Sequence, residues 1–373
     1  MTIVLVTGSK GFIGQNFCVA LKRSDNIQLL TFDSNNSLEE LNEYVKSVDL
    51  VFHLAGVNRP KYETDFITGN IILTQQLCSL LIQNGRNIPI VFSSTIQAEL
   101  NNHYGQSKRV AEDSLIEYSR TTGASIYIYR LPNVFGKWGR PNYNSVISTF
   151  CYNITHGIPI SVKDRDKLIQ FVYVDEVVSS FIEIVYLKRH EGNYRFYEIA
   201  NTFNISLGKI QDLLVEFEQN RYQGIIPDLS DPFTKNLYST FISYINPNKI
   251  AYPARLNTDK RGWLFELIKS PIIGQFFVSS TQSGAIRGNH YHDSKVEKFC
   301  VIKGRAIIRL RSIFCDSVIE YNVNDKYIQI IDIPPGYSHS IENTGDTELL
   351  TLFWSNEIHD ASHPDTWPEN VLV

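Results

Sequence analysis

The sequence lacks the cysteine pattern of a protein held together by disulfide bonds. Its five cysteines are odd in number and share no repeated spacing, so they do not form a disulfide framework. They stand at Cys18, Cys78, Cys151, Cys300 and Cys315. Free cysteines are typical of a reducing compartment, and we therefore expect a cytoplasmic protein.

Other features are missing as well. The first residues run directly into a strand-like segment without a basic leader, and no apolar run approaches the roughly 20 residues that a membrane span needs. A net charge of −4 without a basic stripe gives no support for nucleic-acid binding. We therefore expect no membrane span and no nucleic-acid partner. The 373 residues are enough for two or three globular domains.

The chain alternates between strand-like and helix-like segments up to about residue 240. Short apolar runs are separated by segments with helical periodicity, which is typical of a parallel sheet covered on both faces. The expected strands are residues 3–6, 28–32, 50–54, 89–92 and 125–130. The expected helices are residues 12–22, 38–45, 67–84 and 108–121. This pattern predicts a Rossmann-type, doubly wound α/β domain over residues 1–246.

The pattern changes near residue 250. Residues 246–256, with two prolines among polar residues, form a plausible linker. Short strand-like runs separated by turn residues follow, at 263–269, 274–279, 297–302, 306–311, 318–323, 327–331 and 349–354. Such a series predicts an all-β domain over residues 253–373, either an antiparallel barrel or a jelly roll.

A glycine-rich turn follows the first expected strand. Residues 7–14 read TGSKGFIG and lead into an expected helix. Glycines at Gly8, Gly11 and Gly14 allow a tight turn and a close approach to a pyrophosphate at the helix N-terminus. Asp33 ends the next strand, where a carboxylate commonly binds the adenosine ribose of NAD. A solvated turn aspartate is the alternative.

Tyr104 and Lys108 are the catalytic candidates. Positions i and i+4 share one face of a helix, so the Lys108 ammonium should lie near the Tyr104 hydroxyl and lower its pKa. The phenol would then act as an acid at neutral pH. Ser94 and Thr95 end the preceding strand and offer a hydroxyl to the same substrate carbonyl. An exposed tyrosine–lysine pair without chemistry is the alternative.

A second set of candidates lies near the other end of the chain. His290 and His292 stand one residue apart and share one side of a strand. Glu297 and His339 come from later strands and can complete the set. Three imidazoles and a carboxylate suit zinc, or iron or manganese in an open site. The alternative is a barrel whose histidines are hydrogen-bonded or act as a base without metal.

The N-terminal motifs resemble the extended short-chain dehydrogenase/reductase family. The matching segments are TGSKGFIG (7–14), HLAG (53–56), SST (93–95), YGQSK (104–108), RLPNVFG (130–136) and FVYVD (171–175). The resemblance implies NAD(P) binding, a small lobe for a nucleotide-sugar, and catalysis by Thr95 or Ser94 with Tyr104 and Lys108. Asn133 matches the residue beside nicotinamide and substrate. The cofactor is then expected against Gly8, Lys10, Gly11, Phe12, Ile13, Gly14, Asp33, Leu54, Ala55, Gly56, Tyr104 and Lys108.

The C-terminal motifs resemble cupins, including the deoxysugar 3,5-epimerases. The runs Gly-x5-His-x-His-x4-Glu-x6-Gly from Gly284 and Pro-x-Gly-x2-His-x3-Asn ending at Asn343 resemble the two cupin motifs. Residues 286–291 and 259–266 resemble those epimerases. Arg287 is therefore a candidate for substrate binding. Either resemblance implies removal of a proton next to a sugar ketone, with a metal as Lewis acid or with His290 or His292 as base.

Further segments are VNRP (57–60), GKW (136–138), PNYNSVI (141–147) and VEKFCV (296–301). With these segments the whole chain resembles a bifunctional family of capsular polysaccharide synthesis. This family implies C3 epimerisation of a UDP-2-acetamido-2,6-dideoxy-hexos-4-ulose by a zinc cupin domain. Reduction at C4 then gives UDP-N-acetyl-6-deoxy-L-talose, a precursor of UDP-N-acetyl-L-fucosamine. A homodimer or higher homo-oligomer is also implied. The alternatives are a 4-ketoreductase with a purely structural or dimerising cupin, and a nucleotide-sugar sensor that does not catalyse.

The cofactor choice stays open between NADPH and NADH. Relatives tend to carry a basic residue after the second strand, where it suits a 2′-phosphate. Here Asp33 repels that phosphate and favours NADH, although Lys10 in the first turn could reach it. The resemblance keeps NADP(H) ahead.

Overall fold

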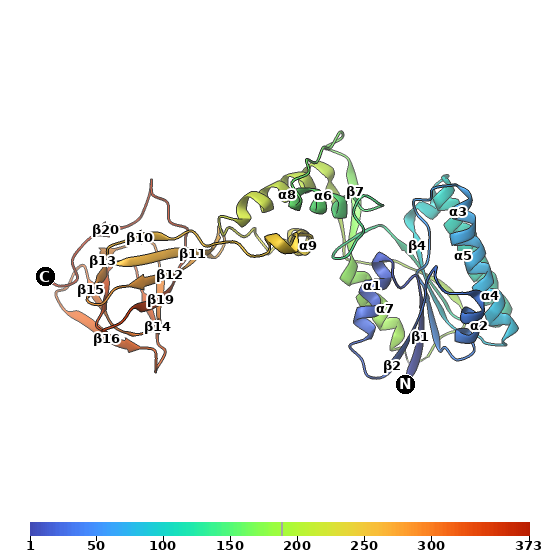
Figure 1. Ribbon diagram of the computed structural model, residues 1–373, viewed down its shortest axis with the longest axis horizontal. Coiled ribbons are helices and arrows are strands. Elements are labelled where there is room, and N and C mark those ends of the chain that lie inside the picture. The colour runs from blue at the N-terminus through green and yellow to red at the C-terminus, as the bar shows by residue number, and fades with distance from the viewer. Residues whose placement is uncertain (188) are drawn as a thin grey trace. The chain divides into compact units, whose positions relative to one another are not determined.

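The computed structural model describes residues 1–187 and 189–373. Within these residues the chain forms two compact units. The first comprises Met1–Leu214 with Asn236–Ile245, and the second comprises Val215–Lys235 with Asn246–Val373. One unit is α/β and the sheets of the other are built from antiparallel strands (Figure 1), which confirms the expected fold class. The expected limits of the domains, 1–246 and 253–373, stay a prediction.

The first unit is built on a parallel sheet. The strands lie in the order β2-β1-β3-β4-β5-β8 and pair in parallel. Their bounds are β1 Thr2–Thr7, β2 Ile27–Phe32, β3 Leu50–His53, β4 Ile90–Thr95, β5 Ile126–Leu131 and β8 Tyr194–Tyr197. Each expected strand begins and ends within three residues of these bounds. The agreement follows because each strand is a short apolar run in a sheet that helices cover on both faces.

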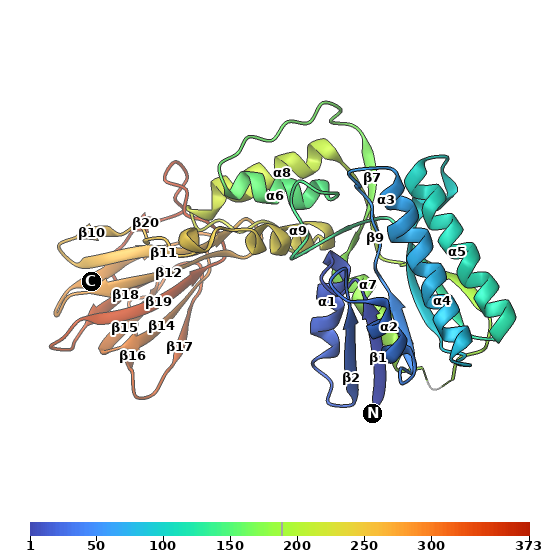
Figure 2. The same ribbon diagram turned by 45° about the vertical axis from the view of Figure 1, so that its right-hand side comes forward.

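Helices cover both faces of this sheet (Figure 2). On one face lie α1 (Phe12–Leu21) and α7 (Val174–Val185), and on the other lie α2 (Leu38–Val45), α4 (Leu73–Gln83) and α5 (His103–Thr122). Successive strand residues point to opposite faces. Val4 and Val6 therefore pack with the first pair of helices, and Leu5 packs with the second group.

The segment before β4 is one long helical run. It consists of α3 (Thr64–Phe66), the π-helical turn η1 (Ile67–Ile72) and α4. By length and composition alone Thr64–Gln83 could cross a membrane, which differs from the expectation that no run is long enough. This is weak evidence for a span, because Leu77 and Leu81 belong to the core of the α/β unit.

A small lobe follows the sheet. The strands β6 (Asn133–Phe135), β7 (Leu168–Tyr173) and β9 (Thr202–Ser206) form a sheet in that order. The neighbouring helices are α6 (Val146–Thr155), α8 (Leu207–Arg221) and α9 (Pro232–Ser243), and short 3-10 turns occupy Ile96–Glu99 (η2) and Pro247–Lys249 (η3).

The second unit contains antiparallel sheets in the orders β10-β11-β12-β19-β14-β17 and β16-β15-β18-β13-β20. The bounds of the first are β10 Asn257–Asp259, β11 Gly262–Ser270, β12 Gly274–Thr281, β19 Leu349–Ser355, β14 Glu297–Lys303 and β17 Ile330–Ile333. Those of the second are β16 Val318–Asn324, β15 Arg305–Ser312, β18 Tyr337–Asn343, β13 Ile286–Tyr291 and β20 Trp367–Pro368. Side chains from both sheets, among them Phe299, Ile308 and Phe353, share one core.

The expected strand at 327–331 is wrong at its start. Tyr327 lies in a turn, where the side-chain oxygen of Asn324 accepts the backbone N–H groups of Lys326 and Tyr327. This local hydrogen bonding competes with the strand ladder and delays β17 until Ile330.

Candidate functional site

The glycine turn between β1 and α1 leaves no room for side chains. Gly8 has a φ of +71°, and a Cβ there would lie 2.6 Å from the Ala55 backbone. A Cβ at Gly14 would lie 2.1 Å from the Gly8 carbonyl oxygen. No side chain caps the N-terminus of α1 at Gly11. The first amides of the helix are therefore free to bind a phosphate.

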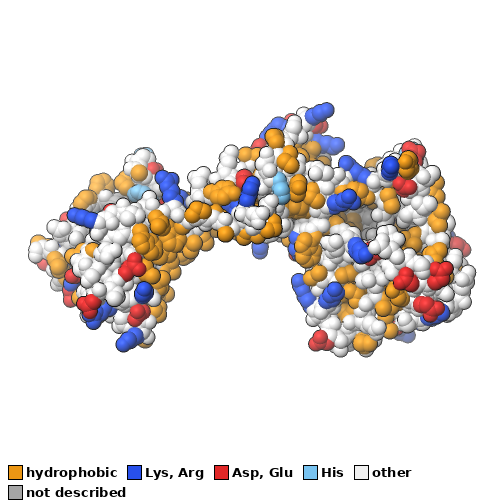
Figure 3. Space-filling view, viewed as in Figure 1, with side chains coloured by type: hydrophobic (Ala, Val, Ile, Leu, Met, Phe, Trp, Pro, Cys, Tyr) orange, Lys and Arg blue, Asp and Glu red, His pale blue; other side chains and the backbone are white. Residues whose placement is uncertain are grey.

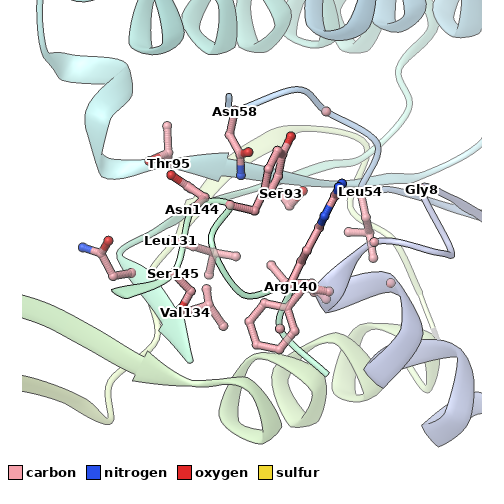
Figure 4. Close-up of a pocket in the computed structure, with 18 of the residues that line it drawn as sticks. Gly8, Leu54, Asn58, Ser93, Thr95, Leu131, Val134, Arg140, Asn144 and Ser145 are labelled. Atoms are coloured by element: carbon pink, nitrogen blue, oxygen red, sulfur yellow. The ribbon is translucent and has the colours of Figure 1, made fainter. Parts of the chain in front are cut away.

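This turn opens into a cavity of about 620 Å³ in the first unit (Figure 4). Most of the expected cofactor and catalytic residues line it together. They are Gly8, Lys10, Gly11, Phe12, Ile13, Gly14, Leu54, Gly56, Ser94, Thr95, Tyr104, Lys108 and Asn133. Asp33 and Ala55 are not among the lining residues, although Ala55 packs on Gly8. Most of the residues that the sequence assigned to the cofactor and catalytic site therefore line the same cavity.

Asp33 makes contacts that the sequence did not predict. Its carboxylate accepts the Ser9 hydroxyl at 2.5 Å and the Lys10 backbone N–H at 3.0 Å. It therefore fastens the glycine turn to the end of β2. Asp33 is therefore not a freely solvated turn residue. Binding of a ribose by Asp33 stays a prediction.

Tyr104 and Lys108 both lie on α5, which begins at His103 rather than at residue 108. The helix starts there because the Asn102 side chain accepts the Gly105 N–H at 2.8 Å and caps it. Lys108 is buried, and its Nζ lies 4.1 Å from the centre of the Phe92 ring. Both candidates line the cavity.

The expected lowering of the Tyr104 pKa is wrong for this structure. Burial raises the pKa of Tyr104 to about 12, with a smaller contribution from Tyr143. Burial also lowers the pKa of Lys108 to about 7, against an opposing effect of Glu112. Removal of water disfavours the charged form of both groups, so the phenol keeps its proton at neutral pH.

Ser94 and Thr95 have different partners. Ser94 donates its hydroxyl hydrogen to the buried carboxylate of Glu112, which Arg130 also holds through Nε at 3.1 Å and Nη2 at 2.7 Å. Thr95 accepts the Gln97 N–H at 3.2 Å, and its own hydroxyl hydrogen is free to face the cavity. The sequence analysis missed Glu112 and Arg130.

A buried polar chain supports the loop beside Gly56. Thr74 donates to the Asn70 carbonyl at 2.6 Å, so it accepts the Nε2 hydrogen of His53 at 2.8 Å. The Nδ1 atom of His53 then accepts the Thr7 hydroxyl at 2.7 Å. Burial and the charge of Lys108 lower the pKa of His53 to about 3, so the ring stays neutral.

Asn70 continues this support toward Tyr104. Its side chain pairs with both backbone groups of Val57, at 2.7 and 2.9 Å, and donates to Ser107 at 2.8 Å. Ser107 in turn donates to the Tyr104 carbonyl at 2.8 Å. The sequence analysis missed Asn70; its only signal was an amide within an otherwise apolar helical run.

The second unit gathers all four expected ligands. One donor atom each from His290, His292, Glu297 and His339 lies within 4.8 Å of the others. His290 lies on β13, His292 directly follows it, and Glu297 and His339 lie on β14 and β18. A β-bulge at Asn289, with a φ of +58°, interrupts the pairing of β13 with β18 and leaves His290 opposite His339.

The charges and the hydrogen bonds of this cluster fit a metal ion. The Nε2 atoms of His292 and His339 each lie 3.3 Å from Glu297 Oε2, yet the buried His339 Nε2 makes no hydrogen bond. Burial would raise the pKa of Glu297, but the two histidines lower it to about 2. Burial and the neighbouring histidines lower the pKa of His290 to about 4. A carboxylate and neutral imidazole are the protonation states that bind zinc.

Arg287 lies on β13 close to this cluster in sequence. Its Nε donates to Thr281 Oγ1 at 3.1 Å and its Nη2 to the Ser280 carbonyl at 3.0 Å. These bonds hold the guanidinium against β12. Burial and the nearby Arg261 lower its pKa. A role in substrate binding stays a prediction.

The parallel sheet, the glycine turn and the cavity define a dinucleotide-binding fold of the kind found in nucleotide-sugar enzymes. Residues 4–200 match the NAD dependent epimerase/dehydratase family, and residues 257–367 match the polysaccharide biosynthesis C-terminal domain. The chain therefore belongs to the NAD dependent epimerase/dehydratase family, in the branch of capsular polysaccharide biosynthesis proteins that carry this C-terminal domain.

The chain is similar to proteins of that branch along its whole length. It is 40% identical to the UDP-2-acetamido-2,6-beta-L-arabino-hexul-4-ose reductase of Pseudomonas aeruginosa, over 99% of this chain and 98% of the relative. The crystal structure of the capsular polysaccharide assembling protein CapF from Staphylococcus aureus is 40% identical, with a TM-score of 0.91 and full coverage of both chains. A UDP-glucuronic acid 4-epimerase from Bacillus cereus in complex with NAD shares only the fold, at 19% identity and a TM-score of 0.52, over 58% of this chain and 84% of the other.

Proposed function

We propose that this chain acts on a UDP-2-acetamido-2,6-dideoxy-hexos-4-ulose in two steps during capsular polysaccharide synthesis. The barrel inverts C3, and the α/β unit then reduces the C4 ketone to give UDP-N-acetyl-6-deoxy-L-talose. The relative from Pseudomonas aeruginosa is named as the reductase of such a 4-ketone, which supports the second step. The observation that carries the proposal is the shared cavity of Tyr104, Lys108 and Thr95 with the glycine turn.

In the reduction, the α/β unit provides the proton and the orientation. NADPH or NADH, held by the glycine turn and the α1 amides, would supply the hydride when bound. Tyr104 keeps its proton at neutral pH and donates it to the C4 oxygen, while Thr95 donates a hydrogen bond to the same oxygen. Lys108, whose Nζ lies 4.1 Å from the centre of the Phe92 ring, lines the same cavity, and its protonated form would favour proton loss from the phenol.

In the epimerisation, the barrel would release the C3 proton to solvent and let a solvent proton return to the opposite face of C3. His290, His292, Glu297 and His339 would hold a zinc ion, whose positive charge would polarise the C4 ketone as a Lewis acid when bound. The proton at C3 is acidic only while C4 is a ketone, because the carbanion delocalises onto that oxygen. The barrel must therefore act before the reductase.

The experiment compares two variants on the 4-keto UDP-sugar in D₂O. Tyr104→Phe should abolish reduction but still allow deuterium to enter at C3. Glu297→Gln should lose the exchange at C3. Mass spectrometry and NMR of the products follow both steps. Tyr186→Phe, at an exposed tyrosine, is the matched control. Full reduction by Tyr104→Phe would contradict the assignment of the phenol.

The alternative of a structural barrel predicts a different outcome. Glu297→Gln and His290→Ala would then leave turnover of the authentic substrate intact, and purified protein would show no stoichiometric metal. The reductase assignment would survive this result, since it depends on the α/β unit.

We also propose a homodimer or higher homo-oligomer, supported by an apolar row on the outside of the barrel. The row follows the strand register from Phe265 to Val278, Leu352, Cys300 and Ile330. Figure 3 shows hydrophobic side chains gathered on one side of this unit. Light scattering of Leu352→Glu should show a smaller particle than the unsubstituted protein; an equal mass would exclude this surface.

A further inference from the structure

The last residues of the chain lie against the metal-ligand cluster. Residues 364–371, called the C-terminal strap here, include β20, whose Pro368 and Trp367 pair with His290 and Tyr291 of β13. The Glu369 N–H donates to the Asn289 carbonyl at 2.9 Å, beside the bulge that places His290. The strap is therefore joined by backbone hydrogen bonds to the strand that carries a ligand.

Asp365 contacts a ligand directly through its backbone. The Nδ1 atom of His292 lies 2.5 Å from the Asp365 carbonyl oxygen. A carbonyl oxygen only accepts, so Nδ1 carries the hydrogen and the Nε2 lone pair points into the cluster. This contact fixes both the tautomer and the orientation of His292.

The Asp365 side chain holds the residues that follow His292. Its carboxylate accepts the backbone N–H groups of Asp293, Ser294 and Lys295 at 2.8 to 3.0 Å, together with the Ser294 hydroxyl at 3.0 Å. The buried Lys295 ammonium donates to the Pro364 carbonyl at 2.9 Å. Asp365 thus holds residues 293–295 of the turn between His292 and Glu297, and Asn356 holds the remaining residue, Val296.

The backbone at Asp365 is unusual. Its φ is +39°, a value that residues other than glycine, asparagine and aspartate rarely adopt. The strap is fixed elsewhere as well, since Arg311 donates to the Val371 and Asn370 carbonyls at 3.0 and 2.7 Å and Ser338 donates to the Glu369 carbonyl at 2.6 Å. These bonds hold Asp365 in a conformation that it would not keep in a free chain end.

We propose that the C-terminal strap is part of the metal site and that Asp365 is a positioning residue, which acts on the ion through His292 and the 293–295 turn. The inference rests on the proposed metal site. Under this proposal, metal affinity depends on Asp365, which lies 73 positions along the chain from His292, the ligand that Asp365 orients. By linkage, if the docked strap strengthens metal binding, then the metal must strengthen docking of the strap by the same factor.

The test measures zinc affinity by competition with a chromophoric chelator. Asp365→Ala removes the carboxylate and strains the backbone, and should weaken zinc binding about 10- to 100-fold. Asp365→Gly keeps the positive φ and the carbonyl acceptor but loses the carboxylate, so it should lose less affinity. Asp365→Asn keeps a side-chain acceptor and should be closest to the unsubstituted protein. Asp360→Ala is the matched control, because Asp360 caps its own exposed turn through Ser362.

Hydrogen exchange of the unsubstituted full-length chain gives a second readout that needs no variant. The amides of residues 365–367 and 369–371 should exchange at least several-fold more slowly with zinc than after its removal, while β1 amides stay unchanged. If the unsubstituted chain binds no zinc, the proposed metal site itself is wrong. If it binds zinc, but Asp365→Ala binds equally well and strap exchange ignores the metal, the metal site stands and the strap proposal is overturned.

Discussion

Ser94 donates its hydroxyl hydrogen to the buried Glu112 carboxylate, whereas the adjacent Thr95 accepts a backbone N–H from Gln97 at 3.2 Å. The two hydroxyls therefore differ in what they can still do. The Ser94 hydrogen already has an acceptor, and the Thr95 hydrogen is available to a substrate carbonyl in the cavity. Of the two alternatives that the sequence left open, the geometry favours Thr95.

Thr95→Val should lower kcat for ketone reduction roughly 100-fold, with little change in melting temperature, because it removes one hydrogen bond to the developing oxyanion. Ser94→Ala should instead lower the melting temperature and keep most of the activity, since Glu112 loses a donor. Steady-state kinetics and thermal unfolding of both variants check this. A larger kcat loss in Ser94→Ala, at unchanged stability, would reverse the assignment.

Lys108→Met should change how stability depends on pH. The pKa of Lys108 is lowered by burial from 10.5 to about 7, so between these pH values the unfolded chain binds one more proton than the folded chain. The free energy of unfolding of the unsubstituted protein therefore rises with pH across this window. Lys108→Met removes that contribution, stabilises the fold near pH 7 and abolishes reduction.

Urea unfolding at several pH values from 7 to 10 measures the difference between the two proteins. Lys46→Met, at a half-exposed surface lysine, controls for the loss of a charge. A pH slope that is the same in Lys108→Met and in the unsubstituted protein would show that the buried ammonium is not the source.

The site residues that belong to short sequence motifs could be predicted from the sequence. The TGSKGFIG turn, the Tyr104 and Lys108 pair, and the histidines at 290 and 292 each combine a residue type with a short spacing that fixes a shared face. His339 was predictable by its residue type and motif, and the structure gathers it with the others. The fold class could be predicted because helices bury both faces of the sheet, and this burial produces short apolar strands between amphipathic helices.

The rest depends on pairs that no local pattern encodes. Arg130 of β5 meets Glu112 of the helix α5 that packs on the same face of the sheet, and Asp365 meets His292 from 73 positions away in the sequence. The pKa of Tyr104 was predicted in the wrong direction for a related reason. A spacing shows that a lysine is near, but not how far the fold removes water from both groups.

Asp33→Asn should shift the cofactor preference toward NADPH. The asparagine oxygen can still accept the Lys10 N–H that now binds the carboxylate at 3.0 Å, so the glycine turn keeps its anchor. The substitution removes a negative charge that repels a 2′-phosphate. We expect the KM for NADPH to fall severalfold relative to that for NADH. Equal KM ratios in both proteins would show that Asp33 does not face the ribose.

Arg130→Met should destabilise the α/β unit by about 3 kcal/mol, because it leaves the buried Glu112 carboxylate without its main partner. The Glu112 side chain is only 2% exposed, and the remaining Ser94 hydroxyl does not neutralise its charge. Arg165→Met is the matched control, since it breaks an exposed ion pair with Asp212 that contributes about 1 kcal/mol or less. Urea unfolding of both variants separates the two effects. A loss in Arg130→Met no larger than that in Arg165→Met would show that the ion pair with Glu112 does not supply the expected stability.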